Sequence, residues 1–109
     1  MHRSERRAGY AVLEPGYAPE VIGPSKYRPG QYQNEGIWPW ITCFLALAWS
    51  RVGDDQRARK IISSLFENDQ QTTHEWIDSL TGHHHHPNFA TAAGAAAWVI
   101  GEIGVMEPL

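Results

Sequence analysis

The sequence predicts an all-α fold made of αα-hairpins, with an irregular N-terminal arm. Three segments with helical patterns of apolar residues follow one another after residue 38, and turn residues separate the first two. The first 31 residues carry prolines and glycines too close together for a helix of any length. The chain therefore divides into an arm over residues 1–31 and a helical region over residues 32–109.

Composition limits the classes of partner. The 109 residues are 42% hydrophobic and 19% charged, which allows one small packed domain. A net charge of -3 argues against nucleic acid as the main partner, because phosphate binding needs a basic surface. Cys43 is the only cysteine, and no apolar run follows the basic start of the chain, so we expect a cytoplasmic protein. The apolar runs are too short to span a bilayer, so no membrane partner is expected.

The first predicted helix runs from about Pro39 to Val52. Pro39 suits a first helical turn, where its missing N–H leaves no bond unmade. Apolar side chains cover the helix nearly all round, which indicates burial on every side. Gly53 is a natural residue to end it.

The second predicted helix, about Asp55 to Glu67, has one apolar stripe and a polar remainder, as in an outer amphipathic helix. A polar loop over Asn68 to Pro87 follows, with a short extended piece at residues 75–77. The third helix, from Asn88 or Phe89 to Glu102, is rich in alanine and glycine and allows very close helix packing. One amphipathic helix cannot bury two apolar helices, so we expect a layered helical array or a protomer that completes its core by association.

Three clusters combine aromatic, amide and carboxylate side chains, and each lies beside a predicted helix. They occupy residues 32–40, 74–78 and 86–89. Sugar sites need flat apolar faces, amides and carboxylates for the hydroxyls, and a carboxyl pair for hydrolysis. The clusters therefore indicate a carbohydrate site. Trp38 and Trp76, in polar segments, are better candidates for stacking on sugars than Trp40, which lies in the apolar helix and is expected in the core.

The order of motifs resembles a known family. It contains Tyr-Gln-Asn-x-Gly-Ile-Trp-Pro at residues 32–39, an apolar helix, a Gly-Asp turn, an amphipathic helix, Glu-Trp-Ile-Asp at residues 75–78, Thr-Gly and an Ala-rich helix. This series resembles the C-terminal part of the (α/α)6 toroid glycosidases. Within that group it is similar to amylo-α-1,6-glucosidases (glycogen-debranching enzymes) and neutral/alkaline invertases. The resemblance implies a partial (α/α)6 toroid over residues 32 to about 103.

The resemblance also implies roles for single residues. Glu75 falls where the family has the general base that activates water. The residues that fall in the sugar-binding loops are Tyr32, Gln33, Asn34, Trp38, Trp76, Asp78, His86 and Asn88. The implied reaction is hydrolysis of an α-glucosidic or related bond in an oligosaccharide or disaccharide by general acid–base catalysis, with no metal or organic cofactor.

This sequence departs from the family pattern in ways that bear on activity. Position 35 is Glu where the family usually has Gly, and the family's general acid, an Asp on an earlier hairpin, has no counterpart here. Glu35 and Asp78 are the nearby carboxyl groups, and neither suits the role. We therefore expect a truncated C-terminal segment of a glycoside hydrolase that is inactive without the remaining hairpins of a parent enzyme.

Two other interpretations stay open. The first is a small helical carbohydrate-binding or assembly protein that associates with itself through its apolar helices. The second is metal binding by the run His83 to His86, since imidazole is a good ligand for zinc and nickel. Consecutive side chains rarely converge on one ion, so a solvated loop is the favoured interpretation of this run and no metal site is expected.

Overall fold

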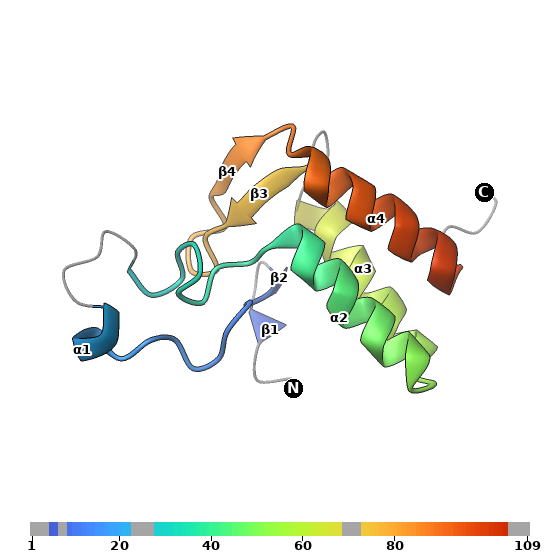
Figure 1. The fold of residues 1–109 in the computed structure, drawn as a ribbon, viewed down its shortest axis with the longest axis horizontal. Helices are drawn as coiled ribbons and strands as arrows, with labels where there is room; N and C mark the ends of the chain where they lie inside the picture. Colours follow the sequence, from blue (N-terminus) through green and yellow to red (C-terminus); the bar gives the residue numbers. More distant parts are fainter. Residues whose placement is uncertain (1–4, 7–8, 23–27, 69–72, 105–109) are drawn as a thin grey trace.

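The computed structural model of the chain describes residues 5–6, 9–22, 28–68 and 73–104. The elements within these ranges are β1 (Glu5–Arg6), β2 (Gly9–Tyr10), α1 (Pro19–Ile22), α2 (Pro39–Arg51), α3 (Asp55–Asn68), β3 (His74–Ile77), β4 (His84–Pro87) and α4 (Ala90–Ile103). Figure 1 shows α2, α3 and α4 packed as one group, with the hairpin of β3 and β4 beside the first turns of α2 and α4.

The expectation of an all-α fold is wrong, because the loop expected over residues 68–87 contains an antiparallel hairpin. β3 pairs with β4, with Trp76 opposite His85 and Ile77 opposite His84. A shorter antiparallel pair joins β1 to β2. The fold is therefore mixed α and β, in contrast to the expected all-α piece of an (α/α)6 toroid.

The turn between β3 and β4 explains why the histidine run is extended. The Asp78 Oδ1 atom accepts the backbone N–H groups of Leu80 at 2.9 Å and Thr81 at 3.0 Å. The Gly82 N–H donates to the Asp78 carbonyl at 2.8 Å, and Gly82 has a φ of 77°, which favours glycine. Asp78 thus reverses the chain and sets the strand register. Histidine has no strong strand preference, so pairing rather than composition determines this segment.

α2 and α3 form the expected helical hairpin, and the predicted boundaries agree with theirs to within one residue. Pro39 occupies the first turn of α2. Gly53, with a φ of 93°, lies in the connection. The Asp54 Oδ1 atom then accepts the backbone N–H of Arg57 at 3.0 Å, which satisfies a donor in the first turn of α3. Local residue chemistry at both helix ends therefore explains this hairpin.

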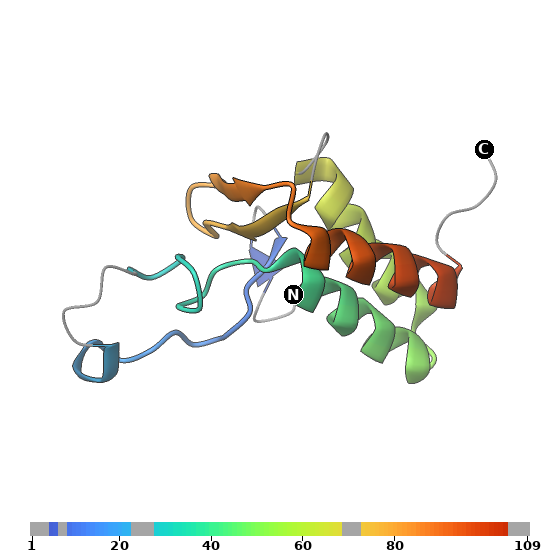
Figure 2. The ribbon, with the colours of Figure 1, turned by 45° about the horizontal axis from the view of Figure 1, so that its top comes forward.

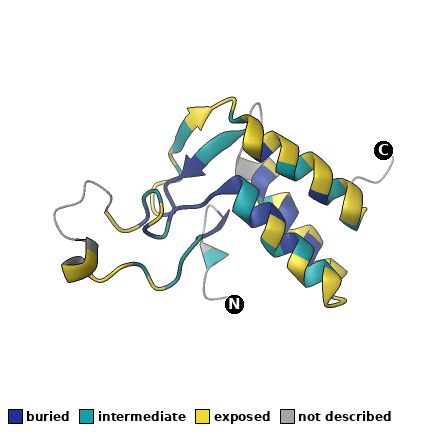
Figure 3. Cartoon of the chain, viewed as in Figure 1, coloured by how far each residue is buried: buried dark blue, intermediate teal, exposed yellow. Residues whose placement is uncertain are grey.

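The core lies between α3 and the sides of α2 and α4 that face it. Its buried members are Tyr10, Cys43, Ala46, Ala58, Ile61, Ile62, Leu65 and Val99. Four of these form the apolar stripe of α3, as the amphipathic pattern predicts. In contrast, α4 is covered on one side only: Ala92 and Val99 are buried, while Figure 3 shows most of the helix exposed. The apolar helices are thus not buried on every side within one chain.

The N-terminal segment runs along residues 34–37. Ala11 forms a β-bridge with Ile37, and the Val12 N–H donates to the Gly36 carbonyl at 2.8 Å. Farther along, the Gly16 N–H donates to Glu35 Oε1 at 3.1 Å. The arm is therefore held by backbone and side-chain contacts to the segment that leads into α2.

Stability depends on the stripe of α3 that faces the core. Ile62 is fully buried, whereas Phe66 on the same helix is 49% exposed. We expect Ile62→Ala to lower the free energy of unfolding by about 2–5 kcal/mol, because it leaves a cavity. Phe66→Ala is the matched control and should cost less than about 1 kcal/mol. Urea unfolding followed by circular dichroism measures both, and equal losses would contradict this core.

Candidate functional site

Two segments far apart in the sequence meet at the base of the β3–β4 hairpin. The Ile37 N–H donates to the Ile77 carbonyl at 2.9 Å, and the Ile77 N–H donates back to the Ile37 carbonyl at 2.8 Å. The Ser79 N–H also donates to the Gly30 carbonyl at 2.8 Å. Figure 1 and Figure 2 show the segment before α2 passing along β3. The polar-aromatic clusters at residues 32–40 and 74–78 are therefore neighbours in space.

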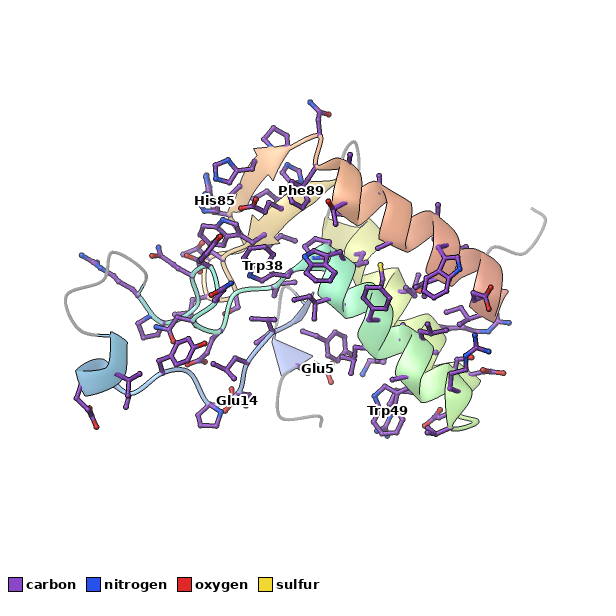
Figure 4. All side chains as sticks on the ribbon, in the orientation of Figure 1. Glu5, Glu14, Trp38, Trp49, His85 and Phe89 are labelled. Atoms are coloured by element: carbon purple, nitrogen blue, oxygen red, sulfur yellow. The ribbon has the colours of Figure 1, made fainter. Side chains whose placement is uncertain are left out.

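Aromatic rings from both segments and from β4 form one cluster, which we call the aromatic cluster: Tyr32, Trp38, Trp76 and His85. The Tyr32 ring lies edge-on to Trp38 and Trp76, with centroids 4.8 Å and 6.0 Å away. His85 stacks flat on Trp76 at 3.8 Å and an interplanar angle of 5°. The Trp38 Nε1–H donates to the Tyr32 carbonyl at 2.9 Å. Figure 4 labels Trp38 and His85 on this side of the molecule.

The two tryptophans form the inside of the aromatic cluster. Trp38 is 8% exposed and Trp76 is 5% exposed, so protein atoms cover the rings that were expected to stack on a sugar. Tyr32 and His85 are half-buried and form the outer part of the cluster. Trp40, which was expected in the core, is also only half-buried. The flat surfaces that this cluster offers to a ligand therefore belong to Tyr32 and His85.

The buried polar residues of the expected site hold backbone. Asn34, 2% exposed, accepts the Tyr17 N–H on its Oδ1 atom at 2.9 Å. Asp78, 5% exposed, makes the turn described above, and its Oδ2 atom accepts a hydrogen bond from Gln31 Nε2 at 3.4 Å. Because buried polar groups are costly unless they are paired, these contacts account for both side chains. Both are positioning residues in this fold.

The backbone conformation at position 35 bears on the presence of Glu35 where the resembled family usually has glycine. The φ of Glu35 is 72°, in the left-handed region that favours glycine, so a glycine at this position is conformationally natural. The Glu35 carboxylate accepts the Gly16 N–H, and this contact ties the N-terminal arm to the loop. The hydrogen bond offsets the cost of a positive φ at a non-glycine residue. Like Asp78, Glu35 is committed to a structural contact and is poorly suited to donate a proton to a leaving group.

Glu75 differs from the other carboxylates of this region. It lies in β3 between His74 and Trp76 and is half-buried. Within the described ranges, its carboxylate has no hydrogen bond or ion pair. The strand register brings His86 of β4 to the same level as Glu75. Among the described residues, Glu75 is therefore a carboxylate without a structural partner, on the strand that also carries Trp76.

The remaining predicted residues lie at the edge of this region. Gln33 is exposed in the loop before α2, and His86 and Asn88 are exposed at the end of β4. His86 and Asn88 have positive φ values of 56° and 61°, which mark a sharp change of direction before α4. The exposed His86 side chain, paired in register with Glu75, therefore lies where it can contact a ligand.

The histidine run contributes ring contacts to the β3–β4 hairpin. His83 lies edge-on to His85 at 4.8 Å, and His74 lies edge-on to His84 at 4.5 Å. Among the described residues, no group of three or more His, Cys, Asp or Glu side chains could hold a metal ion. The stacking of His85 on Trp76 was missed from sequence. If residues 74–77 and 84–87 are paired as antiparallel strands, His85 falls opposite Trp76, and this register is the signal that could have identified the contact.

Burial lowers the pKa of His85 below the ordinary histidine value. Charge on His83, His86 and His74 adds to the lowering, whereas the Asp78 carboxylate opposes it. Since the neutral ring is the one favoured by this environment, His85 packs on Trp76 as a neutral aromatic at neutral pH.

No protein-family model, curated protein or solved structure matches this chain. None of the helices in the described ranges has the length and apolar character needed to cross a bilayer. The functional argument therefore depends on the geometry of the site itself.

The pKa of His85 predicts how stability changes with pH. The folded state holds the His85 proton less tightly than the unfolded state, so the unfolded chain binds more protons as the pH falls below 6.5, the ordinary value. The free energy of unfolding should therefore decrease toward acid pH. His85→Phe keeps a ring on Trp76 and should weaken this dependence. The exposed control His86→Asn should retain most of it, because burial, the largest cause of the lowering, is unchanged. Urea unfolding at several pH values compares them, and an unchanged slope in His85→Phe would contradict the assignment.

The two carboxylates of the Glu-Trp-Ile-Asp segment should differ in their effect on stability. Asp78→Ala removes three hydrogen bonds, two of them to backbone N–H groups in the turn, and should cost about 2–4 kcal/mol. Glu75→Gln should change the free energy of unfolding by less than about 0.5 kcal/mol, because no hydrogen bond within the described ranges depends on its charge. Thermal and urea unfolding of both variants provide the test, and a large loss for Glu75→Gln would sink this distinction.

Proposed function

We propose that this chain forms a carbohydrate-binding surface of a glycoside hydrolase that acts on α-glucosidic bonds, with Glu75 as the general base. The observation that carries the proposal is the half-buried Glu75 carboxylate, which follows His74 and precedes Trp76 in β3 and has no hydrogen bond or ion pair within the described ranges. A general base needs a carboxylate that is free to accept a proton from water. Glu75, which has no hydrogen bond or ion pair within the described ranges, meets this requirement. Asp78 and Glu35 do not, because each accepts backbone N–H groups.

The aromatic cluster supports sugar binding. Tyr32 and His85 offer half-buried flat rings, and the rigid packing of Trp38 and Trp76 behind them keeps those rings in position. Gln33, on the loop that passes along β3, is exposed and carries an amide that can bond sugar hydroxyls.

The second carboxyl group of the reaction comes from another polypeptide segment in this proposal. Inverting hydrolysis uses an acid about 6.5–9.5 Å from the base, with the reacting water between base and sugar. The neighbouring candidates are engaged: Asp78 in the turn and Glu35 with Gly16. This chain should therefore bind an oligosaccharide but should not cleave an ordinary glycosidic bond unaided.

A substrate with a leaving group that needs no protonation isolates the role of Glu75. Fluoride leaves without a general acid, so α-glucosyl fluoride requires only a base that activates water. We expect the chain to accelerate its hydrolysis, and Glu75→Gln to reduce the rate on the order of 10²-fold. Glu102→Gln on the surface of α4 is the control and should have no effect. Fluoride release measured with an ion-selective electrode gives the rate.

Binding is measured separately with maltotriose by NMR titration. Glu75→Gln should bind the sugar as the unchanged chain does, because a base that acts on water contributes mainly to the transition state. Absence of both acceleration and saturable binding would refute the proposal. Binding without acceleration would leave a carbohydrate-binding protein, the alternative that the aromatic cluster also supports.

A further inference from the structure

The side of the helical group that faces away from α3 has an unusual composition. We call this surface the apolar face. It consists of Trp40, Phe44 and Ala48 of α2 and Ala90, Ala93, Gly94, Ala97, Trp98 and Gly101 of α4. Phe44 is 42% exposed and Trp98 is 51% exposed. Their rings lie 6.0 Å apart and connect the two helices, and Trp40 lies edge-on to Phe44 at 5.9 Å. Contiguous exposed apolar surface of this kind marks an interaction site.

The apolar face carries no charged residue. Arg51 and Glu102 lie at one end of it, and their side chains already pair at 2.9 Å. In contrast, the outward side of α3 exposes Arg57, Arg59 and Lys60. Because no like charges meet, this face can contact a copy of itself without electrostatic repulsion.

The glycines of α4 have no explanation within one protomer. A Cβ atom added at Gly94 or at Gly101 would meet nothing within 4 Å. Glycine inside a helix costs roughly 1 kcal/mol relative to alanine, so these positions weaken α4 without any gain in packing inside the chain. Glycine at these two positions is useful only if a partner molecule approaches the α4 backbone closely.

We propose that the apolar face is the interface of a two-fold symmetric dimer with a second copy of this chain. A two-fold interface must be self-complementary, and this face combines projecting rings with a shallow floor of alanine and glycine. A two-fold axis near Ala97 sets two α4 helices antiparallel, so that Ala93 of each chain lies level with Gly101 of the partner subunit. This inference is independent of the proposed sugar chemistry.

The size of the face fits a dimer. The 14 residues of α4 span about 21 Å, and two adjacent helices are roughly 20 Å wide. The projected area is then about 400 Å² per protomer, and the accessible area of a side-chain surface is larger. Two such faces bury on the order of 1,000 Å² in total, which is the lower limit for a specific interface.

Light scattering of the full chain tests the dimer directly. We expect a mass of twice the 12.3 kDa of one chain at micromolar concentrations. Gly94→Lys should raise the dissociation constant about 100-fold or more, because it buries unpaired charge at the interface. It should leave the helix content unchanged, since the position is open in the protomer. Gly101→Lys is a second variant with the same expectation, and Ser63→Lys on exposed α3 is the matched control.

Disulfide trapping gives an independent measurement. Ala97→Cys near the axis should form an intermolecular disulfide under mild oxidation, whereas Ser63→Cys should not. Cys43 does not interfere, because it is buried and burial raises its pKa to about 11. A monomeric chain would overturn the proposal. So would a dimer that neither lysine variant weakens and in which Ala97→Cys crosslinks no faster than Ser63→Cys.

Discussion

The reciprocal hydrogen bonds between Ile37 and Ile77 are the contact on which the candidate site depends. They join the segment before α2 to strand β3, and both side chains are buried beneath the junction. The neighbouring bonds from Ser79 to Gly30 and from Gln31 to Asp78 extend the same seam. Without this seam, the segments that carry Tyr32 and Trp76 would not be held side by side, and the aromatic cluster could not form.

The acidic residues near this seam illustrate how environment separates structure from chemistry. Asp78 and Glu35 accept backbone N–H groups and thereby define a turn and anchor the N-terminal arm. Glu75 makes no such contact within the described ranges and stays half-buried beside Trp76. A carboxylate that is not needed for folding is free to serve a ligand, and this reasoning, more than sequence position, distinguishes Glu75.

Much of the helical part could be predicted from sequence because its signals are local. Pro39, Gly53 and the stripe of α3 each specify a boundary or a face through nearby residues alone. The β3–β4 hairpin could not be predicted in this way, since a run of histidines becomes a strand only when a partner and the Asp78 turn are in place. For the same reason, the burial of Trp38 and Trp76 inside polar segments was not evident. Their covering rings come from Tyr32 and His85, and that arrangement exists only after the segments have paired.

The seam between Ile37 and Ile77 also has a kinetic consequence. The whole of α2 and α3 lies between these two residues in the chain, so the seam closes a long loop, whereas the α2–α3 hairpin is built from local contacts. Loop closure carries an entropic cost that local helix pairing does not. The helical hairpin can therefore form early, and the aromatic cluster assembles late on a scaffold that is already folded. By the same reasoning, the region around Glu75 can open by sub-global unfolding while the helical core stays protected, which gives a binding surface more freedom than its support.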